Sequence, residues 1–146
     1  MNEYLFRGKR TDVDRWITGQ YIHLHKSTYC IGPEPDDNGI HQIVFEEMTD
    51  WGLPNRHLRA DVDPRTVGQY IGRRDINGKQ IFEGDLVTIP GSRRAGLPAP
   101  VKYYAPNCAF VLAREGYNYI LFSDEDDTPY EVVGNIYDGL IKGRKE

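Results

Sequence analysis

Apolar and polar residues alternate along the first third of the chain. From residue 16 to residue 25, a period of two with aromatic and β-branched residues predicts a half-buried strand. We expect further strands at residues 4–8, 27–31 and 40–45, and a loop at 32–39, where two prolines precede Asn38-Gly39. The two predicted faces of the central strand are Trp16, Thr18, Gln20, Ile22 and Leu24, and Ile17, Gly19, Tyr21, His23 and His25. Residues 1–48 are thus predicted to form an antiparallel meander.

The next segment is harder to interpret from its pattern. Trp51-Gly52-Leu53-Pro54 is typical of an irregular connection that carries one buried aromatic residue. Asp63-Pro64 predicts a short helical turn, because aspartate can cap a helix and proline suits its first position. A strand over residues 67–72 is expected to follow.

The second half of the chain begins with its best turn signal, Asn77-Gly78, which predicts a tight hairpin. A strand at 86–89 precedes a long loop at 90–100, rich in proline and glycine. Four more strands are expected at 101–104, 109–113, 117–122 and 130–137. Five short strands suit a small SH3-like barrel, which closes the exposed edges of a short sheet.

These patterns predict an all-β protein with two regions and a tail, forming one compact unit. Residues 1–72 are expected to form an N-terminal antiparallel β meander or open barrel. Residues 73–138 are expected to form the SH3-like barrel, and residues 139–146 a frayed basic tail.

Composition narrows the function classes. The formal net charge of −4 argues against global attraction to nucleic acid or to an anionic membrane. No apolar run approaches the ~20 residues that span a bilayer, and residues 1–7 lack the pattern of a signal peptide. Two cysteines, Cys30 and Cys108, provide no disulfide framework. We therefore expect reduced, buried cysteines and a cytoplasmic location.

The carboxylates Glu83 and Asp85 raise the question of a catalytic pair. No nearby histidine, lysine or nucleophile completes an acid–base set, and no cofactor motif occurs. Gly84 would instead permit a close approach and Asp85 would accept backbone hydrogen bonds where a strand begins. We predict no catalytic residue and no cofactor, and assign structural roles to Asn77, Gly78, Glu83, Gly84, Asp85, Gly134 and Asn135.

Histidines provide another candidate for chemistry. His23 and His25 share one face of a predicted strand, and His41 could join them from a neighbouring strand, although nothing in the sequence fixes that position. A zinc site usually needs three or four ligands. The acidic residues 124–127 lack the pattern of a calcium loop. Ordinary, partly exposed histidines are therefore favoured, and no metal site is predicted.

Basic residues flank the central turn and occupy the long loop. If both connections lie at one end of the barrel, their side chains converge near tyrosines and could hold phosphates or stack on bases. The candidate nucleic-acid or ligand-binding residues are Arg73, Arg74, Lys79, Arg93 and Arg94.

Three ordered motifs give the chain a resemblance to the YopX-like family of phage and prophage proteins. They are Phe6-Arg7-Gly8-Lys9-Arg10 with Trp16 and Gly19-Gln20-Tyr21, then Val67-Gly68-Gln69-Tyr70-Ile71-Gly72 through Asp75-x-Asn77-Gly78-Lys79 to Ile81-Phe82-Glu83-Gly84-Asp85-Leu86-Val87, and Tyr130-Glu131-Val132-Val133-Gly134-Asn135-Ile136-Tyr137-Asp138. The resemblance implies an all-β fold with an SH3-like C-terminal part, and self-association, without an established activity. One departure is the arginine- and proline-containing loop before Pro100-Val101, where members often have a Gly-x-Val strand.

The expected function is that of a non-catalytic protein-interaction or self-assembly module, with a homo-oligomer or another protein as its partner and no membrane. The alternative is nucleic-acid binding through the basic loops. An enzyme, or an inhibitor of a host enzyme, has no support from particular residues.

Overall fold

The computed structural model describes residues 3–91, 97–113, 120–121 and 129–140. The described residues form β-strands and three short 3-10 turns, which confirms the all-β prediction. No helix among them could cross a membrane. The chain divides into two compact units: an N-terminal unit, Tyr4–Gln69, and a C-terminal unit, Tyr70–Glu146 with Met1–Glu3. The division between Gln69 and Tyr70 falls inside one strand.

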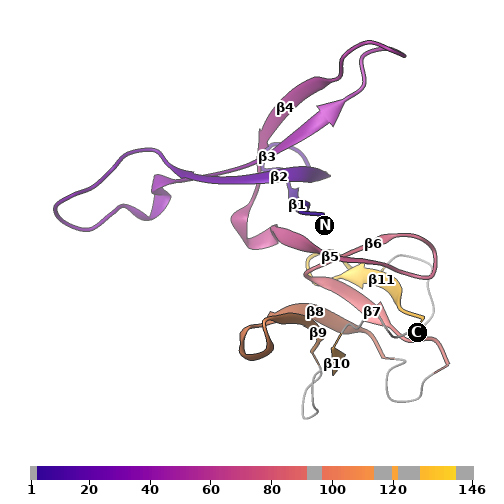
Figure 1. The fold of residues 1–146 in the computed structure, drawn as a ribbon. Helices are drawn as coiled ribbons and strands as arrows, with labels where there is room; N and C mark the ends of the chain where they lie inside the picture. The colour runs from indigo at the N-terminus through magenta and orange to yellow at the C-terminus, as the bar shows by residue number, and fades with distance from the viewer. Residues whose placement is uncertain (1–2, 92–96, 114–119, 122–128, 141–146) are drawn as a thin grey trace. The chain divides into compact units, whose positions relative to one another are not determined.

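The N-terminal unit is an antiparallel sheet with the strand order β4-β3-β2-β1, and β1 also pairs with the first residues of β5 (Figure 1). The strands are β1 (Phe6–Lys9), β2 (Trp16–His25), β3 (Gly39–Glu47), β4 (Arg56–Asp61) and β5 (Gly68–Arg74). The observed bounds of β2 are those that the alternation predicts. Its buried face is the one that contains Ile17 and Tyr21. The core contains Ile17, Ile43, Ala60 and Val62, with Tyr21, Phe45 and Val67 packed against it.

Two connections extend from opposite ends of β3 in this unit (Figure 1). We call residues 26–38, between β2 and β3, the first arm, and residues 48–55, between β3 and β4, the second arm. The predicted strand at 27–31 is wrong: the hairpin closes where Lys26 N donates to Asn38 O (2.8 Å) and Ser27 N donates to the Asn38 side chain (2.9 Å). Residues 27–31 therefore have no neighbouring strand, and the first arm ends in the 3-10 turn η1 (Asp36–Asn38).

The second arm also corrects the sequence interpretation. Trp51 is 91% exposed and not buried, because it lies at the tip of a hairpin, away from the core. The strand β4 that follows was not predicted.

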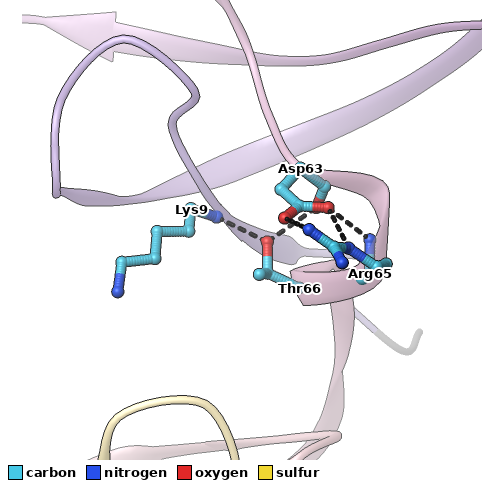
Figure 2. A network of polar contacts seen from close by, with 4 residues as sticks. All are labelled: Lys9, Asp63, Arg65 and Thr66. Atoms are coloured by element: carbon cyan, nitrogen blue, oxygen red, sulfur yellow. Dashed lines mark hydrogen bonds and ion pairs between the residues drawn. The ribbon is translucent and has the colours of Figure 1, made fainter.

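The turn η2 (Pro64–Thr66) forms as the sequence predicts. Asp63 accepts hydrogen bonds from Arg65 N (3.0 Å) and from the Arg65 side chain (2.9 Å). Thr66 Oγ1 donates to Asp63 O (2.7 Å) and accepts from Lys9 N (2.9 Å), as Figure 2 shows. The cap thereby joins η2 to the end of β1.

The C-terminal unit starts with a hairpin and continues as a second antiparallel sheet. The remainder of β5 pairs with β6 (Gln80–Phe82). The sheet order is β10-β9-β8-β7-β11-β12, and the 3-10 turn η3 (Ala105–Asn107) joins β8 to β9. The strands are β7 (Asp85–Thr88), β8 (Ala99–Tyr104), β9 (Ala109–Leu112), β10 (Ile120–Leu121), β11 (Glu131–Asn135) and β12 (Gly139–Leu140). An SH3-like barrel stays a prediction, because the described strands give an open order with β10 and β12 at its ends.

The core of the C-terminal unit is larger than that of the N-terminal unit. Its buried members are Ile81, Val87, Ala99, Val101, Leu112 and Val132, from β6, β7, β8, β9 and β11, and Tyr130, which directly precedes β11. Ile71, Ile89 and Phe110 pack against them. The predicted strand at 117–122 lies outside the described residues except for Ile120–Leu121, and the acidic loop 124–127 and residues 141–146 of the tail lie outside them entirely.

Candidate functional site

The buried carboxylates of the central motif hold turns together. Asp75 Oδ1 accepts from Asn77 N and from Lys79 N (2.8 Å each), and Asp75 Oδ2 accepts from Val132 N (3.1 Å). Asp85 is 1% exposed, and its Oδ2 accepts from Phe82 N (2.8 Å). Glu83, which lies between Asp75 and Asp85 in the sequence, is half-buried. Both buried aspartates thus accept hydrogen bonds from backbone N–H groups of their own unit, which is a structural arrangement.

Glycine and asparagine positions of the motifs fit tight backbone geometry. Gly78 has φ +77° at the β5–β6 turn, a conformation that glycine adopts at little cost. A Cβ at Gly134 would lie 2.2 Å from Gly139 O, where the register of β11 against β7 shifts. Gly84 N donates to Val101 O, and Asn135 Oδ1 accepts from the backbone of Tyr137 and Asp138.

The five predicted basic residues separate into three groups. The Arg73 guanidinium lies over the Tyr130 ring, 4.6 Å from its centroid. Arg74 donates to Gly78 O (2.9 Å) within its own hairpin, where Lys79 is exposed. Arg93 and Arg94 lie outside the described residues. The convergence of all five side chains therefore stays a prediction.

The two arms carry the most exposed large apolar side chains of the described residues. Ile31 in the first arm is 94% exposed, and Trp51 in the second is 91% exposed. Tyr29 in the first arm and Met48 and Leu53 in the second are also exposed. The cysteines are likewise exposed, which corrects the prediction that they are buried. The alternation of apolar and polar residues predicts burial only within strands, so it could not identify these exposed apolar residues, which lie in the connections between strands.

A cluster of histidines lies at the base of the first arm. His23 of β2 and His41 of β3 are direct cross-strand partners, and their rings stack with centroids 4.3 Å apart. The Tyr21 hydroxyl is hydrogen-bonded to His41 Nδ1, and His25 Nε2 lies 3.5 Å from Glu34 Oε1. The sequence indicates that His23 and His25 lie on one face of a strand. The position of His41 depends on the register between β2 and β3, which cannot be deduced from the length of the first arm.

Burial is the main reason that the pKa of His41 lies below its ordinary value, and the charge of His23 lowers the pKa further. The neutral imidazole is therefore favoured at His41. Among the described residues, no three His, Cys, Asp or Glu side chains are already arranged to hold a metal ion.

Comparison with known families matches residues 5–139 of the chain to the YopX protein family. The chain belongs to the YopX family. The match covers both arms and both aspartates of the central motif, so the motifs that suggested the resemblance are part of one extended similarity in this YopX family member. No curated protein matches the chain significantly.

Proposed function

We propose that this YopX family member is a non-catalytic interaction module that associates with a second copy of itself through its two arms. The observation that carries the proposal is the exposure of Ile31 and Trp51, at 94% and 91%. Exposed apolar residues gathered on projecting connections are typical of contact sites. Tryptophan is also among the residues that contribute most to binding when a partner covers them.

Several features support a second copy as the partner. The arms extend from opposite ends of β3, so one molecule offers two separate contact sites. Self-association is also what the family resemblance implies.

Sedimentation velocity, or size-exclusion chromatography with light scattering, at tens of micromolar tests the proposal. We expect an oligomer for the unmodified chain, and a shift toward monomer for Trp51→Ser and for Ile31→Ser. Ile76→Ser is the matched control, since Ile76 is an exposed apolar residue of the C-terminal unit. A strict monomer for the unmodified chain, or dissociation by Ile76→Ser but not by Trp51→Ser, would contradict the proposal.

The resemblance also supports a phage or prophage origin and action in the cytoplasm of a bacterial host, which we include in the proposal. Nucleic-acid binding through the basic loops is the second candidate function. It is supported by the exposed Arg74 and Lys79 at the β5–β6 hairpin. It is less favoured, because Arg73 and Arg74 make contacts within their own unit.

A further inference from the structure

An open pocket of ≈ 330 Å³ lies at the base of the first arm. Its lining combines three imidazoles with two carboxylates: His23, His25, His41, Glu34 and Asp36, together with Pro35 and Gly39. Imidazole nitrogens are preferred ligands of zinc, copper and nickel ions, and carboxylates add favourable negative charge. The concentration of these groups around one pocket is unexplained by the proposed contacts of the arms.

The register of β2 and β3 places a residue without a side chain at the centre of this group. Gly39 is the cross-strand partner of His25, next to the His23–His41 pair. A Cβ at Gly39 would lie 2.8 Å from His41 Nε2 and 3.6 Å from His23 Nε2. The two Nε2 atoms therefore border the same space, which glycine leaves open. The backbone of Gly39 has φ −77°, so its conformation does not itself require glycine.

The hydroxyl of Tyr21 orients one of these rings. It is hydrogen-bonded to Nδ1 of His41, the nitrogen on the other side of the ring from the pocket. If Nδ1–H donates to the tyrosine oxygen, Nε2 carries a lone pair directed toward the pocket. Metal-binding histidines usually have a hydrogen-bonding partner on their second nitrogen, which fixes the tautomer in this way.

We propose that His23, His25 and His41 bind one divalent transition-metal ion such as Zn²⁺. Tyr21 is a positioning residue, which orients His41. In the structure His23 and His41 stack, so the rings of His23 and His25 must turn about their side-chain torsions, while Tyr21 holds His41, to bring the nitrogens to the ~2.0–2.1 Å of a Zn–N bond. His23 and His25 are exposed, so these rotations meet little resistance. Three protein ligands leave the fourth position of a tetrahedral ion to water or to Glu34.

Isothermal titration calorimetry of the chelator-treated full chain with Zn²⁺ near neutral pH tests the site. We expect one ion per chain, and a loss of affinity of about tenfold or more for His23→Ala and for His41→Ala, since removing even an outer partner of a metal ligand costs 10–100-fold. His57→Ala is the matched control, because His57 is an exposed histidine on β4 and outside the pocket. Unchanged thermal unfolding of the metal-free variants shows that they fold.

The Gly39→Ala variant distinguishes a metal site with a defined geometry from exposed histidines that bind Zn²⁺ independently of one another. It keeps every histidine but fills the space between the two Nε2 atoms, so we expect it to weaken Zn²⁺ binding while His57→Ala does not. Tyr21→Phe is expected to weaken binding by about tenfold, as loss of such a partner does. Absence of heat at high micromolar Zn²⁺, or equal losses for His57→Ala and His41→Ala, would overturn the proposal. So would an unchanged affinity in Gly39→Ala.

Discussion

Among the residues that the structure describes, the core cluster of the C-terminal unit contains seven buried apolar residues, whereas that of the N-terminal unit contains four. The C-terminal unit also buries Asp75 and Asp85, whose oxygens satisfy backbone donors at its turns. The N-terminal unit has Ile31 and Trp51 on its arms, where they are almost fully exposed. The strongest sequence motif of the chain therefore lies in the unit with the larger described core, while the surface that we propose for contacts lies in the other unit.

The largest change in stability is expected from substitutions in the cores of the two units. Leu112→Ala in the C-terminal unit and Ile43→Ala in the N-terminal unit each remove a fully buried side chain, at a cost of about 2–5 kcal/mol in the free energy of unfolding. Both tryptophans, Trp16 and Trp51, belong to the N-terminal unit. We expect Ile43→Ala to lower the urea midpoint seen by tryptophan fluorescence more than Leu112→Ala does. Equal shifts would mean that the units unfold as one.

Asp75 tests how far the C-terminal unit depends on its buried carboxylates. Asp75→Ala leaves three backbone N–H groups without their acceptor, and each buried loss costs about 1–3 kcal/mol. Asp75→Asn keeps one carbonyl oxygen and should destabilise less. Amide hydrogen exchange is the measurement, with faster exchange at Val132 expected in both variants. Slow exchange at Val132 in Asp75→Ala would show that its bond to Asp75 is dispensable.

Asp63 provides a smaller, pH-dependent effect in the N-terminal unit. Hydrogen bonds from the Arg65 side chain and backbone hold the pKa of Asp63 below its ordinary value of 3.8. Because the folded-state pKa is the lower one, this stabilisation is present above pH 3.8 and is lost as the pH falls through the folded-state pKa. Asp63→Ala should cost about 1 kcal/mol near neutral pH, as loss of a cap does, and less in acid. Urea unfolding at both pH values measures this, and an equal cost at both would contradict the assignment.

The smallest effect is expected on nucleic-acid binding, when Arg93 and Arg94 are replaced. Fluorescence anisotropy with single-stranded DNA and RNA, at low and moderate salt, compares the unmodified chain with Arg93→Ala/Arg94→Ala. We expect little binding and no difference between them, because the proposed contacts lie on the arms. Binding at low salt that the double substitution abolishes would instead support the second candidate function.

The sequence pattern predicted correctly those elements that are determined by residues close to one another in the sequence. The alternation in residues 16–25 specifies β2, and Asp63-Pro64 specifies η2, because a cap and a fixed φ act within a few residues. The same reasoning failed at residues 27–31, since β propensity makes no strand without a neighbour to pair with. It missed β4, whose sequence Arg-His-Leu-Arg-Ala-Asp has polar residues at most positions, as suits an edge strand.

The candidate site was less predictable than the fold. Hydrophobicity favours burial of Trp51, but the position of a residue at a hairpin tip depends on where the strands end. His23 and His41 become neighbours only through the β2–β3 register, and a change of one residue in that register would separate them. The open space at Gly39 likewise exists only once the strands are paired.

The exposed cysteines have a practical consequence. Cys30 lies between Tyr29 and Ile31 in the first arm, whereas Cys108 follows η3 in the C-terminal unit. Cys108→Ser would therefore leave a chain that a thiol-reactive dye labels at one place only, beside the proposed contact. Mixing donor- and acceptor-labelled chains would then report by energy transfer whether two chains associate, with no label site introduced by mutation.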